Sequence, residues 1–114
     1  MNKVTTNDLL SKYFINNGKW SYKGTNPCVI QFSADWCTVC KPQESILSEM
    51  KKEYSEVEFL KVNVEEEYEL AEIFNIKNLP TIFVCGGKET KQFSGLTQKT
   101  KIEEVLKNQM EVIA

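Results

Sequence analysis

Stretches with the pattern of strands alternate with stretches that have the spacing of helices, and this alternation limits the fold of the chain more than any other feature. Residues 28–32, Cys-Val-Ile-Gln-Phe, form an almost continuous apolar run typical of a buried strand. Apolar residues recur at helical spacing from Cys37 to about Tyr54, a second strand follows at 57–64, and a third helical stretch begins near 65–67. This order predicts an α/β sandwich.

The C-terminal part of the chain adds a hairpin to the predicted sheet. A strand at 81–85 is followed by a Gly86-Gly87 turn and a second strand through Phe93. Residues 97–113, with Ile102 on their apolar face, predict a closing helix. Because the two hairpin strands run antiparallel to each other, the sheet is predicted to be mixed.

The N-terminal part predicts one helix and a long loop. Asn7 or Asp8 can cap a helix, which the Asn17-Gly18 pair would end. The apolar face of this helix would consist of Leu9, Leu10, Tyr13 and Phe14. Residues 18–27 are expected to form a loop.

The composition indicates a single globular domain, residues 1–114. A chain of 114 residues buries roughly two-thirds of the surface that it exposes when unfolded, so it can fold without a metal or a disulfide framework. Its formal net charge is −2, and neither sign gathers into a long block suited to a phosphate backbone. Nucleic acid is therefore not expected as a partner, and no run of about eighteen apolar residues predicts a membrane span.

The sequence lacks histidine and an apolar N-terminal stretch, which limits the possible catalytic groups and the expected location of the protein. The chain has no histidine, which excludes a Ser-His-Asp triad, a Cys-His nucleophile pair and every metal site that needs imidazole. Its first residues lack the apolar stretch of a signal peptide. We therefore expect a cytoplasmic protein, and the alternative is a periplasmic protein whose signal peptide has been removed.

The cysteine pair Cys37-Thr38-Val39-Cys40 lies where the buried strand passes into the helix. Residues three apart on a helix share one face, so the two sulfurs can form and break a disulfide without backbone rearrangement. Unpaired N–H groups and the helix dipole at a helix N-terminus favour the thiolate of Cys37. Cys37 is therefore the predicted nucleophile, and Cys40, one turn inward, is the predicted resolving thiol.

Two other interpretations of the pair stay open on the residues alone. It can be a chance pair of packing cysteines, or it can be half of a zinc site, because the same spacing opens many metal sites. Zinc would need Cys28 and Cys85 as its other ligands, and both lie inside predicted strands. We therefore expect no metal, and we interpret Cys28 and Cys85 as small buried apolar residues.

Residues 32–41, Phe-Ser-Ala-Asp-Trp-Cys-Thr-Val-Cys-Lys, resemble the active-site segment of the thioredoxins. The resemblance covers about residues 28–108. It includes Leu79-Pro80-Thr81 as the family's cis-proline segment, Lys61 as its buried lysine and Ser94-Gly95-Leu96 as its glycine loop. It implies the thioredoxin fold, an α/β fold in which a central mixed β-sheet is flanked by helices on both faces.

The same resemblance implies a function and its site. The protein is expected to be a monomeric thiol-disulfide oxidoreductase that reduces protein disulfides, needs no cofactor and is recharged by a thioredoxin reductase. The residues implied to bind the substrate are Trp36, Val39, Leu79, Pro80 and Gly95, with Leu96 at the rim. On the residues alone, the apolar side chains can equally be ordinary core, and Leu79-Pro80 can be a simple turn before a strand.

Two positions depart from the family pattern. Thr38-Val39 replaces the usual Gly-Pro between the cysteines, and we expect a somewhat weaker reductant as a result. Gln31 aligns with the family's buried aspartate, which helps to move a proton to or from the resolving cysteine, but an amide cannot titrate. Gln31 and Lys61 are the candidates for a proton path. The loss of the aspartate leaves a rival prediction, a thioredoxin-like binding subunit of a larger enzyme with redox-inactive or weakly active cysteines.

Overall fold

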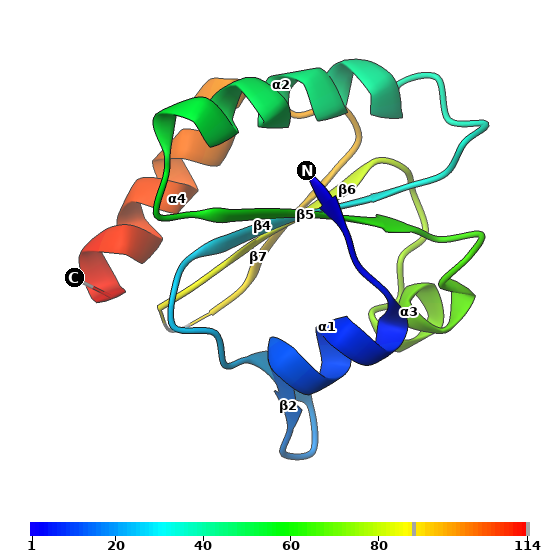
Figure 1. Ribbon diagram of the computed structural model, residues 1–114, viewed down its shortest axis with the longest axis horizontal. Coiled ribbons are helices and arrows are strands. Elements are labelled where there is room, and N and C mark those ends of the chain that lie inside the picture. Colours follow the sequence, from blue (N-terminus) through cyan, green and yellow to red (C-terminus); the bar gives the residue numbers. More distant parts are fainter. Residues whose placement is uncertain (88, 114) are drawn as a thin grey trace.

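The computed structural model describes residues 1–87 and 89–113 of the chain (Figure 1). These residues form a five-stranded sheet, a separate two-stranded hairpin and four helices. In chain order the elements are β1 Asn2–Lys3, α1 Thr6–Lys12, β2 Phe14–Asn16, β3 Trp20–Tyr22, β4 Cys28–Ser33, α2 Cys40–Glu53, β5 Glu58–Asn63, α3 Tyr68–Ile73, β6 Thr81–Cys85, β7 Lys91–Ser94 and α4 Lys99–Ile113.

The five-stranded sheet is mixed and has the strand order β1-β5-β4-β6-β7. Strands β1 and β4 both run parallel to β5, whereas β6 runs antiparallel to β4 and to β7. Helices α2 and α4 cover one face of the sheet, and α1 and α3 cover the other (Figure 1). The predicted mixed sheet with helices on both faces is confirmed.

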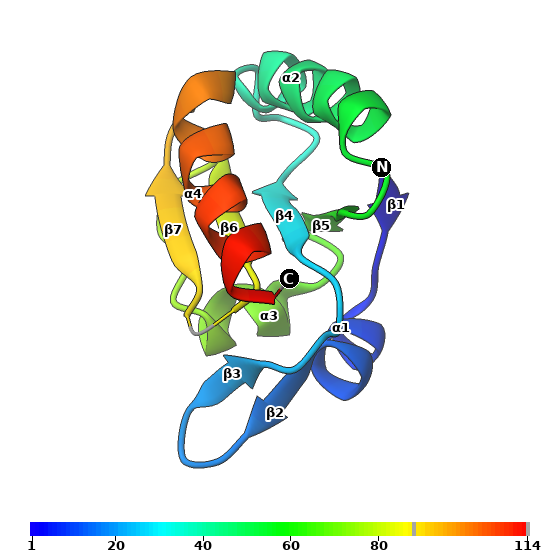
Figure 2. The same cartoon turned by 90° about the vertical axis from the view of Figure 1, so that its left-hand side faces the viewer.

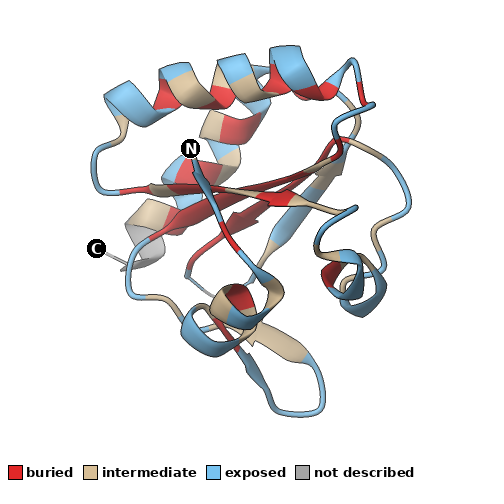
Figure 3. Ribbon diagram, turned by 45° about the vertical axis from the view of Figure 1, so that its right-hand side comes forward, coloured by how far each residue is buried: buried red, intermediate tan, exposed pale blue. Residues whose placement is uncertain are grey.

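The central strand β4 supplies side chains to the core on both faces of the sheet. Ile30 packs in one cluster with Leu9 of α1, and Val29 packs in the other cluster with Leu47 of α2. The central strands are therefore buried, while the outer faces of the helices are exposed (Figure 3). Because side chains alternate along a strand, Gln31 shares the face of Val29 and lies beneath α2.

The prediction for the N-terminal part is wrong in two respects. Helix α1 is only seven residues long, and its cap is Thr5, whose hydroxyl accepts the N–H of Asp8 at 3.1 Å. The chain then turns at Gly18, which has a φ of 96°, so that β2 and β3 pair as an antiparallel hairpin where a loop was expected (Figure 2). Phe14 has helical spacing, but from β2 it reaches the same core and packs edge-on against Tyr22, with ring centroids 5.7 Å apart.

Two further differences arise in very short segments. Strand β1 was not predicted, because two residues are too few to show a hydrophobic period; it pairs Asn2 with Leu60 of β5. Helix α3 begins at Tyr68, after the glutamates that were expected to start it. Those glutamates form a turn in which the N–H of Glu67 donates to the carbonyl of Asn63 at 2.8 Å.

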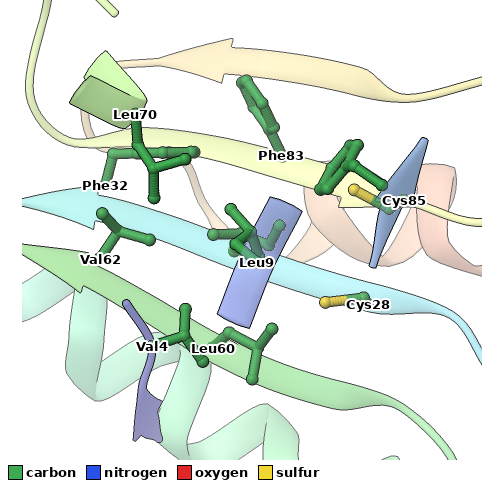
Figure 4. Packing of buried hydrophobic residues seen from close by; sticks show 11 residues of the cluster. Val4, Leu9, Cys28, Phe32, Leu60, Val62, Leu70, Phe83 and Cys85 are labelled. Carbon is green, nitrogen blue, oxygen red and sulfur yellow. The ribbon is translucent and has the colours of Figure 1, made fainter. Parts of the chain in front are cut away.

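Cys28 and Cys85 are opposite each other on β4 and β6, and both are fully buried in one hydrophobic cluster (Figure 4). Burial away from solvent raises the pKa of the Cys85 thiol to about 12. Burial raises the pKa of the Cys28 thiol as well, and the neighbouring Cys85 adds to this effect. Because thiols react as thiolates, both cysteines should be unreactive in the folded protein.

We expect alkylation of the native, reduced protein to label Cys37 well before Cys28 or Cys85. Iodoacetamide labelling at timed intervals, followed by peptide mass spectrometry, measures the order. Labelling in urea is the control, and there Cys28 and Cys85 should react like ordinary thiols. If either of them is labelled in the native protein as fast as Cys37, burial does not protect these thiols and the prediction fails.

Candidate active site

Strand pairing brings three chain segments to one edge of the sheet. Phe32, near the end of β4, is opposite Thr81, which begins β6, and Thr81 is opposite Ser94, which ends β7. The segments beyond these strand ends carry the cysteine pair, the cis peptide bond Leu79–Pro80 and Gly95. The N–H of Gly95 donates to the carbonyl of Pro80 at 2.8 Å, which ties two of the three segments together.

The cysteine pair occupies the turn between β4 and α2. The N–H of Cys37 donates to the carbonyl of Ala34 at 3.1 Å, and the N–H of Cys40 donates to the carbonyl of Cys37 at 3.3 Å. Helix α2 begins only at Cys40, with Val39 as its cap, so the prediction that it begins at Cys37 is wrong by one turn. Cys37 still lies at the helix N-terminus, because its sulfur is bonded to the first helical residue.

Cys37 and Cys40 form a disulfide, and their Cα atoms are 5.4 Å apart. This separation is ordinary for a disulfide, so the same backbone can hold the closed pair without a large rearrangement. Each of the two residues is only 4% exposed. An open cavity of about 300 Å³ borders both of them, and it is lined by Ser33, Ala34, Asp35, Cys37, Cys40, Lys41, Glu44 and Lys61.

Apolar side chains near the pair differ strongly in their exposure. Trp36 is 67% exposed and Val39 is 45% exposed, on either side of Cys37 in the sequence. Leu96, in the loop after β7, is 43% exposed. Leu79 is half-buried and Pro80 is buried, so this segment offers less side chain to the surface than Trp36 does.

A buried glutamine that the sequence analysis missed joins the loop after β7 to α2. Gln43 is fully buried; its Oε1 accepts the N–H of Thr97 at 2.7 Å, and its Nε2 donates to the carbonyl of Thr97 at 3.0 Å. The two bonds hold the loop with Gly95 and Leu96 against the first turn of α2. The available signal was position: Gln43 lies three residues after Cys40, on the same face of the helix.

Gln31 and Lys61, the two candidates for a proton path, have different partners. Gln31 is 1% exposed, and its Nε2 donates to the backbone carbonyl of Cys40 at 2.9 Å. Lys61 is opposite Gln31 on β5, but its ammonium group pairs with the carboxylate of Glu44 at 2.9 Å. Glu44 was not a sequence candidate, although it lies one helical turn after Cys40 and lines the same cavity.

The described residues contain neither a cluster of metal ligands nor a membrane-spanning helix. No group of three His, Cys, Asp or Glu side chains among them lies close enough together to hold a metal ion. None of the described helices is both long and apolar enough to cross a bilayer. Cys28 and Cys85, the other ligands that zinc would need, lie at the end of the β4–β6 ladder that is far from Phe32 and Thr81.

Comparisons with known proteins agree with this geometry. The family model described as Thioredoxin matches residues 15–108. The thioredoxin of Borreliella burgdorferi is 30% identical over 109 residues, which are 92% of this chain and 93% of that protein. The thioredoxin of Mycoplasma genitalium is 37% identical over 81 residues, 70% of this chain and 79% of that protein. The X-ray structure of Fasciola hepatica thioredoxin matches with a TM-score of 0.75 at 29% identity, and covers 96% and 99% of the two chains.

These matches, together with the disulfide at the edge of the sheet, define a thiol-disulfide oxidoreductase with the thioredoxin fold. The chain belongs to the thioredoxin family. The predictions of fold, family and disulfide reductase activity are confirmed. The rival prediction, a redox-inactive binding subunit, is not favoured.

Proposed function

We propose that the protein reduces disulfides of other proteins, with Cys37 as the nucleophile and Cys40 as the resolving thiol. The Cys37 thiolate attacks one sulfur of the substrate disulfide, and the other sulfur leaves with the electron pair and takes up a proton. Cys40 then gives up its proton and attacks Cys37, which releases the second substrate sulfur and closes the Cys37–Cys40 disulfide. The substrate gains two electrons, and the two cysteines lose them.

The disulfide at the sheet edge is the observation that carries this proposal, and its surroundings support the order of the two roles. Cys37 lies in a turn between the exposed residues Trp36 and Thr38. Cys40 begins α2, and its carbonyl is bonded to the buried Gln31. A substrate that approaches over Trp36 therefore meets Cys37 first.

The proton that Cys40 gives up leaves through the cavity that borders the pair. Gln31 holds the Cys40 backbone in place, but its amide cannot take the proton. The Lys61 and Glu44 side chains in the cavity are 32% and 37% exposed, so water reaches both. Solvent water is then the final acceptor. Lys61 lines its path, and Gln31 lies outside the cavity and holds the Cys40 backbone.

The partners follow from the family and from the exposed apolar side chains near the cysteine pair, here called the apolar rim: Trp36, Val39 and Leu96. The backbone of Leu79, next to Pro80, can pair with an extended substrate segment as an added strand, while Trp36 and Val39 contact its apolar side chains. Gly95 lies in the same binding region. Proteins with accessible disulfides are thus the substrates and a thioredoxin reductase is the electron donor, whereas nucleic acid and membranes are not partners. Residues 1–114 form a single domain in this proposal, and the protein acts as a monomer in the cytoplasm.

Trp36→Ala should raise the KM for a protein disulfide about threefold to tenfold, the size of one lost aromatic contact. The rate with a small model disulfide should change little, because such a substrate does not cover the rim. Insulin reduction at varied insulin concentration measures the first quantity. Ile15→Ala is the matched control, because Ile15 is an exposed apolar residue on the β2–β3 hairpin. Equal KM values for Trp36→Ala and the wild type would show that Trp36 does not contact the substrate.

A further inference from the structure

One buried polar atom beneath the disulfide has no hydrogen-bond partner. Among the described residues, Oε1 of Gln31 is the one buried side-chain nitrogen or oxygen without a partner. The Nε2 of the same amide is bound to the carbonyl of Cys40 at 2.9 Å, and the residue is 1% exposed. The unpaired oxygen therefore belongs to an amide that is bound to the backbone of Cys40 and is shielded from bulk water. A buried acceptor without a donor is unfavourable.

The redox state of Cys40 decides whether a donor is available there. In the disulfide, the Cys40 sulfur carries no hydrogen. Two-electron reduction turns it into a thiol, whose S–H group is a donor. Cys40 is 4% exposed, so its new S–H group also lacks free access to water.

We propose that the reduced Cys40 thiol donates its hydrogen to Oε1 of Gln31. The inference deepens the proposed function, because it rests on Cys40 being the thiol that stays protonated until resolution. The hydrogen bond exists only in the dithiol state, so Oε1 of Gln31 has a donor in the reduced protein and none in the oxidised one. Gln31 thereby stabilises the dithiol relative to the disulfide and makes the protein a weaker reductant.

The charged residues around the cavity do not take the place of the Cys40 S–H group as a donor to Gln31. Lys61 and Glu44 pair with each other at 2.9 Å, and Asp35 and Lys41 are exposed. Gln31 is uncharged at every working pH, so its hydrogen bond to the thiol does not depend on a protonation state of its own. The effect of Gln31 on the equilibrium between dithiol and disulfide therefore comes from a buried, uncharged residue beneath the cysteine pair.

Gln31→Met keeps the length of the side chain and removes the acceptor. We expect its equilibrium with reduced and oxidised glutathione to move roughly threefold toward the disulfide, the size of one weak hydrogen bond. Gln109→Met is the matched control. Gln109 is also a buried glutamine, but it bonds the carbonyl of Glu89 and should leave the equilibrium unchanged. An unchanged equilibrium in Gln31→Met overturns the proposal.

A second measurement needs no variant at position 31. A hydrogen bond weakens the S–H bond, so the S–H stretching band of Cys40 in the reduced wild type should lie at the lower frequency of a bonded thiol. Loss of one infrared band in Cys40→Ser assigns it. A Cys40 band at the frequency of an unbonded thiol overturns the proposal, even if Gln31→Met fails to fold. Neither measurement involves protein disulfide reduction, so a failure here is distinct from a failure of the proposed function.

Discussion

Cys37→Ser is expected to abolish the reduction of protein disulfides. A serine hydroxyl does not ionise near neutral pH and cannot form the mixed disulfide with a substrate sulfur, so the first step of the reaction has no nucleophile. The rate of insulin reduction by dithiothreitol should fall to the rate measured without protein. This is the largest effect expected from any single substitution in the chain.

Cys40→Ser should give a different result, because it removes only the second step. The mixed disulfide between Cys37 and the substrate should accumulate and should be visible on a non-reducing gel. Cys28→Ala is the matched control: it also removes a thiol, but from a buried strand opposite Cys85, and it should keep the wild-type rate. If Cys37→Ser and Cys40→Ser both retain wild-type rates above the background, the binding-subunit interpretation is restored.

The sheet and the cysteine pair could be predicted from the sequence because their signals are local. The buried run of β4 and the helical spacing of α2 each specify an element without reference to distant residues. The antiparallel β6–β7 pair was predicted as well, although β7 begins at Lys91, later than a two-residue turn at Gly86-Gly87 would place it. The spacing of Cys37 and Cys40 likewise makes their pairing possible within one turn. These features depend on residues within a few positions of one another, which is the range that a sequence pattern reports.

The N-terminal hairpin could not be predicted because its decisive contacts are not local. Phe14 suits a helix by spacing, yet it lies in β2, where it packs against Tyr22 and Phe74. The choice between helix and strand is made by that packing and by the turn at Gly18. Propensity is a weak guide when tertiary contacts favour another structure.

The polar residues of the site were only partly predictable for the same reason. The position of Gln31 followed from its place on a buried strand, but its bond to the carbonyl of Cys40 requires α2 to lie across that strand. The residue types of Gln43 and Glu44 give no signal, because glutamine and glutamate are common on solvated helix faces, and only their spacing of three and four residues from Cys40 points to the site. Their partners, Thr97 and Lys61, are supplied by other elements.

Gln31→Asp should speed disulfide exchange near neutral pH and destabilise the fold. A carboxylate beneath Cys40 can accept the thiol proton, and burial should raise its pKa toward the range where a general base works best. We expect the rate to rise severalfold, well below the ~10² of a full general base, because water already accepts the proton in the wild type. Stopped-flow reduction of a model disulfide between about pH 6 and 9 measures the effect.

The loss of stability caused by Gln31→Asp should increase with pH. A buried carboxyl with a raised pKa is neutral at low pH, so the destabilisation should be smallest there. It should grow as the pH rises above about 4, where the unfolded chain ionises, and level off above the raised pKa of the folded protein. Urea unfolding should show a loss of roughly 2–4 kcal/mol at neutral pH, as for a poorly paired buried charge.

Gln31→Asn separates the new charge from the shortened side chain. It has the length of aspartate but cannot titrate, so it should keep the pH dependence of the wild-type rate and lose less stability than Gln31→Asp at neutral pH. The difference in rate and in stability between Gln31→Asp and Gln31→Asn is the effect of the carboxylate. If Gln31→Asp and Gln31→Asn have the same pH-rate profile, a base at position 31 does not reach the Cys40 proton. In that case the proton of Cys40 must leave entirely by the side of the cavity where Lys61 and Glu44 lie.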